Sequence, residues 1–468
     1  MNVLAHFEAI SQIPRGSGNE KAVSDYVADF ARGLGLETIQ DKWNNLIIFK
    51  PGTPGYESKD PVILQAHLDM VCEKNADTVH DFTRDPIKTY IDGDFMKARG
   101  TTLGADNGIG VALCMAFLQD GEAHPPLEIV LTTDEETGMD GAENLDMSQL
   151  KGRRLINLDT GDETTFVMGC AAGTTAEYTL PAQWTTLEPG LTVCEIYVKG
   201  LKGGHSGEDI KKERGNALRI LGHLLASLGD DVKIAKVSGG MKVNAIPRES
   251  EAIIAFTDEK KAEAALEKCR QDLQEQFRIS DSGLCIEWKI GGNAEKILTH
   301  EWGQKVVSSL LLIPTGVEAR SLEIDDLVNA SCNLGVVETS ESSIKMSAMV
   351  RGAAELYNRQ IERQIAALAK HMGADIKFMQ RSPAWPFNPE SKLLKTAVGV
   401  YSTVFKREPK FTAIHGGLEC GLFSDKIPGI DIVSFGPDTH DLHTPDERLS
   451  LSSTARVCEF LQVMLREL

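Results

Sequence analysis

The sequence predicts an α/β protein in which a domain with a mostly parallel central sheet is interrupted by an inserted α+β domain. Three observations lead to this expectation. Residues 1–160 alternate short apolar runs with helical patterns, residues 176–382 contain longer alternating strands, and residues 383–468 return to the first pattern. A chain of 468 residues is also too long for one ordinary domain.

The N-terminal part contains short apolar runs bounded by polar or turn residues, a pattern typical of strands that helices cover on both faces. Apolar residues at helical spacing predict one helix over 22–34, ending near Gly33 and Gly35, and another over 109–117. The predicted strands are Leu46–Phe49, Val62–Leu64, Ile129–Leu131 and Leu155–Leu158.

The middle part has a different pattern of apolar and polar residues. A predicted strand at Thr192–Val198 precedes a helical pattern around 216–228, and a strand at Ser343–Val350 precedes one around 358–371. Both strands alternate apolar and polar residues, as expected of a sheet with one face in water. Residues 250–290 indicate a strand, an acidic helix and a strand. We therefore expect an α+β domain, with a hint of internal duplication.

The C-terminal part returns to buried strands and amphipathic helices. Residues 430–435 predict a buried strand, and residues 457–465 predict a closing helix. The simplest arrangement is one domain made of residues 1–175 and 383–468, with residues 176–382 inserted. Two such domains would form a cleft, which is a common place for an active site.

Composition and charge argue against several classes of protein. The formal net charge of −19 disfavours binding to a nucleic-acid backbone. The first residues lack the pattern of a secretory signal, and no run of about 18 apolar residues predicts a membrane span. The nine cysteines are scattered without a CxxC pair, which favours small buried side chains in a reducing compartment. We therefore expect a cytoplasmic protein.

Polar residues follow the apolar runs at several points. His67 and Asp69 come directly after the strand that begins at Val62, where the carboxylate can orient the imidazole. Asp106 lies in a glycine-rich turn before a predicted helix. Simpler explanations exist, since the histidine could be hydrogen-bonded at a strand end and the aspartate could cap the helix.

Acidic residues follow two further strands. Glu135 and Glu136 belong to a run of three carboxylates after Leu131, which favours a cation site or a general base over a surface loop. Asp159 follows another buried strand, and His443 follows the strand predicted at 430–435. In open α/β sheets, ligands bind at the carboxyl ends of the strands.

Together these residues favour a metal centre. Two histidines and three carboxylates suit two divalent ions of the zinc, manganese or cobalt type, with one carboxylate as a bridge. Two ions roughly 3.5–4 Å apart can hold a hydroxide and polarise a carbonyl. A further carboxylate beside them could take the proton of the water and pass it to a leaving amine.

The motifs around these residues resemble the M20 metallopeptidases, and most closely the aminoacyl-histidine (Xaa-His, carnosinase-like) dipeptidase branch. The matching segments occur at both ends of the chain, so the resemblance covers nearly all of it. They are Gln65–Val71, Thr102–Gly108, Asp134–Gly138, Asn157–Asp159 and His440–Pro445.

The resemblance implies a ligand set. His67, Asp106 and Asp159 would hold one ion, and Asp106, Glu136 and His443 would hold the other, with Asp106 as the bridge. Two Zn²⁺ per chain are the implied cofactors, and Mn²⁺ or Co²⁺ could substitute for them.

The resemblance also implies residues that carry the reaction. Glu135 would be the general base and then the general acid, and Asp69 would orient His67. His205, in the glycine-rich segment Leu201–Gly207, resembles the lid histidine that stabilises the oxyanion. A donor of this kind contributes about 3–4 kcal/mol in comparable sites. The simpler explanation for His205 is an ordinary loop histidine.

Three residues resemble the substrate-binding residues of the family. They are Asn244, Arg351 and Gly417. Arg351 ends an apolar strand, where it could grip a carboxylate in bidentate fashion or form a strand-end salt bridge. Gly417 lies in a glycine turn that opens a helix and presents N–H groups to an anion.

The implied reaction is hydrolysis of dipeptides, either Xaa-His substrates such as carnosine or a broader range. Deacylation of N-acyl amino acids and aminopeptidase action would use the same metal chemistry, and a noncatalytic binding protein would not need Glu135. A small dipeptide is the expected partner, and neither nucleic acid nor membrane is. Because twofold dimers are the commonest soluble oligomers, we expect a homodimer. Whether His205 acts within its own chain or across subunits stays open.

Overall fold

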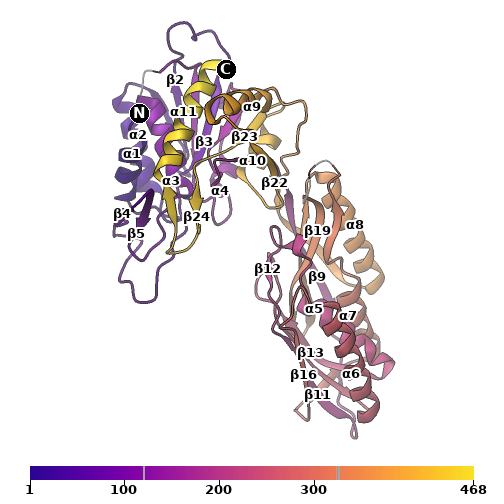
Figure 1. Cartoon of the computed structure of the whole chain (residues 1–468). Helices are drawn as coiled ribbons and strands as arrows, with labels where there is room; N and C mark the ends of the chain where they lie inside the picture. The colour runs from indigo at the N-terminus through magenta and orange to yellow at the C-terminus, as the bar shows by residue number, and fades with distance from the viewer. Residues whose placement is uncertain (120–121, 323, 325–326) are drawn as a thin grey trace. The chain divides into compact units, whose positions relative to one another are not determined.

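The structure, a computed structural model, describes residues 1–119, 122–322, 324 and 327–468. The described chain forms two compact units (Figure 1). Unit 1 contains Met1–Gly169, Phe387–Ala413 and Leu418–Leu468, and unit 2 contains Cys170–Pro386 and Ile414–Gly417. The domain limits 1–175 with 383–468 and 176–382 stay a prediction.

Unit 1 is built on a mixed sheet. Its strand order in the described chain is β1-β2-β6-β3-β7-β23-β8-β22. The four central strands, β6, β3, β7 and β23, pair in parallel, whereas β1, β2 and β8 pair antiparallel with their neighbours. The predicted α/β class is confirmed, and parallel pairs form the centre of the sheet. The strands are β1 Glu37–Gln40, β2 Leu46–Lys50, β3 Val62–His67, β6 Leu127–Thr132, β7 Arg154–Asn157, β8 Thr165–Cys170, β22 Lys410–Ile414 and β23 Asp431–Ser434.

Helices cover this sheet and close the core of unit 1. Helix α3 is apolar on nearly every side because it packs between α1 and strand β3. The helices are α1 Val3–Ser11, α2 Lys21–Gly33, α3 Ala105–Gln119, α4 Asp140–Asn144, α9 Lys392–Phe405, α10 Glu419–Lys426 and α11 Leu451–Glu467. A small sheet, in the order β24-β25-β5-β4, comprises β4 Thr89–Asp92, β5 Phe95–Ala98, β24 Thr439–His440 and β25 Arg448–Ser450.

Unit 2 is an antiparallel sheet with helices packed along one side (Figure 1). Its order is β16-β11-β15-β13-β19-β20-β9-β21, and β18 also pairs with β19. The long strands are β9 Ala172–Pro181, β11 Thr192–Lys199, β13 Lys233–Gly239, β15 Ser250–Phe256, β16 Cys285–Ile290, β18 Gly316–Arg320, β19 Val328–Thr339, β20 Ser343–Gly352 and β21 Asp375–Ser382. Two small pairs are β10 Trp184–Thr186 with β17 Lys296–Leu298, and β12 Gly204–His205 with β14 Ala245–Ile246.

The helices of unit 2 follow the predicted strand-then-helix pattern. They are α5 Ala217–Ser227, α6 Glu259–Gln276, α7 His300–Leu312 and α8 Glu355–Met372. Helix α5 follows β11, α8 follows β20, and α6 joins β15 to β16, as the sequence indicated. Their apolar faces and the sheet form a core separate from that of unit 1.

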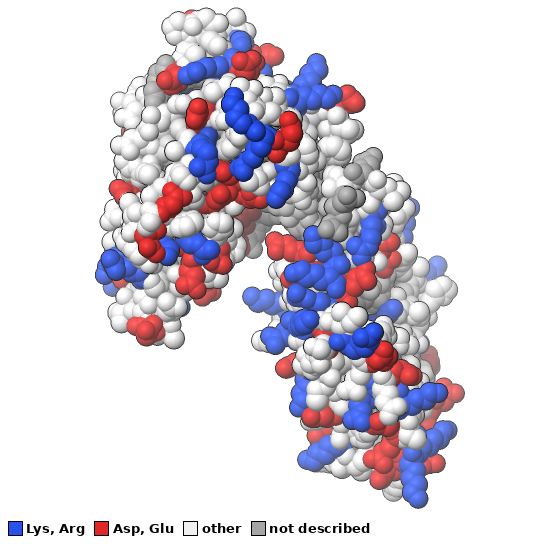
Figure 2. Space-filling view, in the orientation of Figure 1, with Lys and Arg blue, Asp and Glu red and all other residues white. Residues whose placement is uncertain are grey.

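The surface and the cysteines agree with the composition. On the face shown in Figure 2, acidic and basic side chains are interspersed over both units. No disulfide joins the described cysteines, and most of them are buried. Within the described ranges, no helix is both long and apolar enough to cross a membrane.

Candidate metal centre

The carboxyl ends of the central strands gather the predicted ligands in unit 1. His67 is the last residue of β3, Asp159 follows β7, and Glu136 follows β6. Asp106 lies at the start of α3, and His443 lies between β24 and β25. Parallel strands end at a common edge, so residues far apart in the sequence meet there.

Asp106 lies between the two histidines. His67 Nε2 is 3.1 Å from Asp106 Oδ1 and 3.4 Å from Asp159 Oδ1. His443 Nε2 is 3.4 Å from Asp106 Oδ2 and 3.2 Å from Glu136 Oε1. Ligand atoms of His67, Asp106 and Glu136 all lie within 4.8 Å of one another, so these side chains could hold a metal ion.

The crowding of carboxylates shifts the protonation of the cluster. Hydrogen bonds to Asp106 and Glu136 raise the pKa of His443 to about 10. Burial lowers the pKa of His67, but Asp159 and Asp106 outweigh it and hold that pKa well above its usual value. Burial raises the pKa of Asp159 to about 7. The carboxylates therefore draw protons onto the cluster, and in such an arrangement a bound cation can take the place of those protons.

Asp69 contacts His67 and the backbone of the loop that follows strand β6. Its carboxylate accepts hydrogen bonds from Ser17 Oγ at 2.8 Å and from the backbone N–H groups of Glu135 and Glu136 at 3.1 and 3.2 Å. His67 Nδ1 is 3.1 Å from Asp69 Oδ1. Burial opposes ionisation, but the bond to His67 lowers the pKa of Asp69 to about 2. With Nδ1 engaged, Nε2 of His67 is directed toward Asp106.

Glu135 lies beside the cluster and is not one of the three residues whose ligand atoms come together, His67, Asp106 and Glu136. Burial raises the pKa of its carboxyl well above the ordinary value, and the negative charge of Asp159, Glu419 and Glu136 raises it further. A carboxyl with a raised pKa is suited to accept and return a proton near neutral pH.

Three buried charged residues around the cluster were not predicted: Arg15, Glu419 and Glu447. Glu419 accepts hydrogen bonds from Gln65 Nε2 at 2.6 Å and from Thr132 Oγ1 at 2.7 Å, and burial raises its pKa to about 8. None of the three belongs to a recognisable spacing pattern. The available signals were only the nearness of Glu447 to His443 and of Glu419 to a glycine turn.

The remaining predicted residues belong to unit 2. Arg351 is 7% exposed, its Nε lies 3.5 Å from Ser206 Oγ, and burial lowers its pKa to about 10. The backbone oxygen of Asn244 accepts a hydrogen bond from Ser206 N at 2.8 Å. His205 immediately precedes Ser206, and burial together with the charge of Arg351 lowers the pKa of His205. Ser206 therefore contacts Arg351 and Asn244 and is the chain neighbour of His205, so it connects three of the predicted residues.

Gly417 lies in the segment 414–417, which also belongs to unit 2. His415 in this segment was not predicted. Its Nε2 is 2.7 Å from Ser331 Oγ, and burial lowers its pKa to about 3, so the imidazole is neutral. A Cβ at Gly207 would lie 2.2 Å from the backbone oxygen of His415, which explains the glycine.

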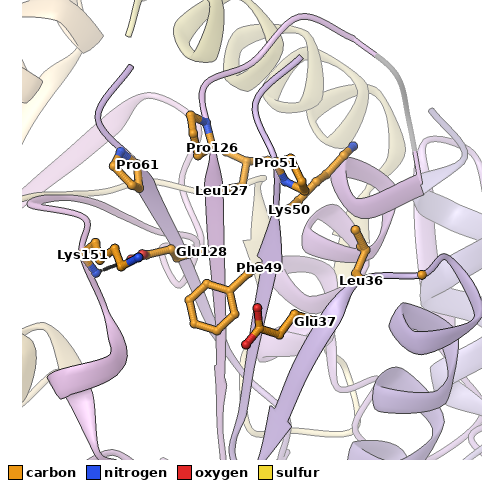
Figure 3. Close-up of a pocket in the computed structure, with 11 residues that line it drawn as sticks. Leu36, Glu37, Phe49, Lys50, Pro51, Pro61, Pro126, Leu127, Glu128 and Lys151 are labelled. Carbon is orange, nitrogen blue, oxygen red and sulfur yellow. Dashed lines mark hydrogen bonds between the residues drawn. The ribbon is translucent and has the colours of Figure 1, made fainter. Parts of the chain in front are cut away.

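A hollow of about 390 Å³ lies at the other end of the unit 1 sheet (Figure 3). Phe49, Pro61 and Leu127 line it beside the amino ends of β3 and β6. Glu128 in its wall accepts hydrogen bonds from the backbone N–H groups of Lys151 at 2.9 Å and Gly152 at 3.0 Å. The predicted ligands lie at the carboxyl ends of the same strands.

The sequence pattern of peptidase family M20/M25/M40 matches residues 63–467, a range that includes all five predicted ligands. The chain belongs to this peptidase family. The predicted family resemblance and the expectation of a peptidase are therefore confirmed.

Relatives of this peptidase cover nearly the whole chain. The cytosol non-specific dipeptidase of Escherichia coli (strain K12) is 36% identical over 467 residues, which are 99% of this chain and 96% of the relative. The crystal structure of aminoacylhistidine dipeptidase from Vibrio alginolyticus has a TM-score of 0.92 at 35% identity, covering 100% of this chain and 96% of that one. Aminopeptidase PepT from Bacillus cereus shares only the fold, with a TM-score of 0.58 at 15% identity, covering 99% and 97% of the two chains.

Proposed function

We propose that this chain is a metal-dependent dipeptidase that uses two divalent ions. The observation that carries the proposal is the position of Asp106, whose two carboxylate oxygens lie 3.1 and 3.4 Å from His67 and His443. Similarity to two dipeptidases along nearly the whole chain supports the choice of substrate class.

The donor set fits two ions of the zinc type. Imidazole nitrogen and carboxylate oxygen are the usual ligands of Zn²⁺, and Mn²⁺ or Co²⁺ accepts the same donors. We assign His67 and Asp159 to one ion, Glu136 and His443 to the other, and Asp106 to both. When bound, two such ions polarise a peptide carbonyl and activate water for attack.

Two side chains of the protein are assigned to proton transfer and to the orientation of a ligand. Glu135 takes the proton of the attacking water and gives it to the leaving amine, which its raised pKa favours. Asp69 holds His67 in the orientation in which Nε2 is the ligand atom. This division of roles requires Glu135 to be dispensable for metal binding and Asp69 to be important for it.

Residues of unit 2 are assigned to the substrate. Arg351 and Asn244 bind the peptide, with the guanidinium on its C-terminal carboxylate, and Gly417 supplies backbone contact to the same group. His205 stabilises the oxyanion that forms on the attacked carbonyl. The lowered pKa of His205 keeps its imidazole neutral at pH 7, in which state it can donate one hydrogen bond.

The names of the two relatives bear on the preferred dipeptide. One relative is named a non-specific dipeptidase and the other an aminoacylhistidine dipeptidase, so we propose Xaa-His substrates, including carnosine, within a broader dipeptide range. A side-by-side assay of carnosine, Ala-His, a tripeptide and an N-acetyl amino acid tests this choice. Turnover of the N-acetyl substrate alone would indicate a deacylase, and preference for the tripeptide would indicate an aminopeptidase.

Glu135→Ala tests the mechanism itself. The variant should retain two equivalents of metal by elemental analysis and lose nearly all turnover of the best dipeptide. The matched control is Glu143→Ala, which removes an exposed glutamate eight positions further along the chain and should leave turnover unchanged. Normal turnover by Glu135→Ala would refute its role as the base, and full activity with fewer than two equivalents of metal would refute the dinuclear centre.

We also propose that the protein is cytoplasmic and a homodimer. The cytosolic relative supports the location, and the frequency of twofold dimers supports the assembly. Sedimentation equilibrium gives the mass in solution directly, and a value near the 51.1 kDa of one chain would exclude the dimer.

A further inference from the structure

The turn that carries Asp106 is held from two sides by buried charged residues. We propose that Glu447 and Arg15 are positioning residues that fix this turn between the segments of the two histidines. The inference rests on the proposed metal centre and adds residues that neither the ligand set nor the proton chemistry includes.

Glu447 binds one side of the turn through its backbone. Its Oε2 accepts hydrogen bonds from the N–H groups of Leu103 and Gly104 at 2.7 and 2.9 Å, and its Oε1 accepts them from Ala105 and Asp106 at 2.8 and 3.3 Å. The residue is 2% exposed. Successive backbone N–H groups that converge in this way form an anion-binding concavity, and bonds to an ionised acceptor are stronger than neutral ones.

Arg15 binds the other side of the turn. Its guanidinium donates hydrogen bonds to the backbone oxygen of Gly104 and to those of Leu68 and Asp69 at 3.0 and 2.9 Å. Arg15 is also 2% exposed. Gly104 has a φ of +71°, and a Cβ there would lie 2.6 Å from Arg15 Nη2, so the close approach requires glycine.

These contacts connect three segments that carry proposed ligands. Arg15 joins the turn to the two residues that follow His67, and Glu447 joins it to the segment that contains His443 four positions earlier. Because the oxygens of Asp106 face both histidines, a displaced turn would change both distances at once. A carboxylate and a guanidinium buried in this arrangement therefore fix the spacing of the ligands.

Glu447→Gln is the direct test, because the amide keeps the size of the side chain and removes its charge. Glu128→Gln is the matched control. Glu128 is 3% exposed and also accepts backbone N–H groups, but at the opposite end of the same sheet (Figure 3). Three quantities are measured for each protein: the affinity of the metal-free form for Zn²⁺ by calorimetry, the visible spectrum of the Co²⁺-loaded form, and kcat and KM for a dipeptide.

Glu447→Gln is expected to bind Zn²⁺ roughly 10–100-fold more weakly, with an altered Co²⁺ spectrum and a lower kcat at similar KM. Glu128→Gln should match the wild type in all three quantities. Wild-type affinity and spectrum in Glu447→Gln would overturn the proposal, and so would an equal loss of affinity in both variants. Should Glu447→Gln not fold, Arg15→Lys replaces it, with the same expected and overturning results.

The outcome for the wild type separates this proposal from the function on which it rests. A wild-type protein that takes up none of Zn²⁺, Mn²⁺ and Co²⁺ contradicts the proposed metal-dependent dipeptidase. A wild type that binds two equivalents while Glu447→Gln and Arg15→Lys behave identically to it contradicts only the positioning role.

Discussion

At the scale of single residues, the proposed centre is a group of carboxylates whose charge is partly balanced by two histidines. His443 has a pKa of about 10, and the pKa of His67 is well above its ordinary value. These raised pKa values favour the positively charged, doubly protonated form of both imidazoles at pH 7 while no cation is bound. A histidine coordinates metal only in its neutral form.

Binding of Zn²⁺ at pH 7 should therefore release protons. Both histidines lose a proton when they become ligands, so the apparent affinity should rise with pH across the neutral range. Calorimetric titrations in buffers of different ionisation enthalpy measure the number of protons released. An affinity independent of pH between 6 and 8 would contradict this expectation.

Arg351 gives a second prediction at this scale. Its buried guanidinium is proposed to hold the carboxylate of the dipeptide in a bidentate arrangement that lysine cannot reproduce. Arg351→Lys should raise KM for a dipeptide roughly 10-fold or more, as a charged hydrogen bond contributes about 1.5–3 kcal/mol. A dipeptide amide lacks the carboxylate and is the control. The prediction is wrong if the substitution affects the amide as strongly as the acid.

At the scale of secondary-structure elements, a buried polar network joins the four parallel strands just below the ligands. Gln65 of β3 bonds to Thr132 of β6 and to Asn157 of β7, and Asn157 bonds to Ser434 of β23. Glu419, the first residue of α10, accepts from both Gln65 and Thr132. The network therefore fixes the lateral positions of the strand ends that carry the ligands.

Removing the carboxylate of Glu419 from this network should destabilise unit 1. Glu419→Ala removes a buried acceptor that Gln65 and Thr132 share and should lower the free energy of unfolding by about 1–3 kcal/mol, whereas Glu419→Gln should cost less. Urea unfolding of the metal-free proteins measures the change. Glu467→Ala, at an exposed position of α11, is the control and should remain within about 0.5 kcal/mol of the wild type.

Among these elements, the local patterns of the strands can be predicted from the sequence, and the long-range contacts between them cannot. The central strands are predictable because their apolar runs are local, and His67, Asp106 and Asp159 are recognisable because each follows or precedes such a run. The contacts of Arg15 and Glu447 join residues 53 to 344 positions apart and are made to backbone groups, which leave no spacing in the sequence. For the same reason, the antiparallel flanks of the unit 1 sheet were not anticipated.

At the scale of the whole molecule, the residues proposed for the reaction belong to two units that have separate hydrophobic cores. The proposed ligands belong to unit 1, whereas Arg351 and His205 belong to unit 2. Bound metal should therefore stabilise one core directly and leave the other unchanged when no substrate is present. A ligand at 100 times its Kd stabilises the state that binds it by about 2.7 kcal/mol.

Removing metal with a chelator should reveal this difference. Hydrogen exchange should accelerate in β3, β6 and β7 of unit 1 and stay unchanged in β11 and β20 of unit 2. Mass spectrometry of peptides from the two units, with and without chelator, makes the comparison within one sample. An equal acceleration in both units would show that the metal stabilises the molecule as one cooperative body.

The long segment of unit 2 begins and ends at the same place. Cys170 and Trp385 exchange two backbone hydrogen bonds, of 2.9 and 3.0 Å, so its first and penultimate residues are neighbours. Residues paired in this way have Cα atoms about 5.5 Å apart, a gap that a short turn can close. In evolutionary terms, a segment whose ends are paired in this way can be inserted at a single point of the gene without separating the flanking parts of unit 1. Exchange of this segment would replace Arg351 and His205, which are proposed to bind the substrate and stabilise the oxyanion, and would leave in place the sheet that carries the proposed ligands.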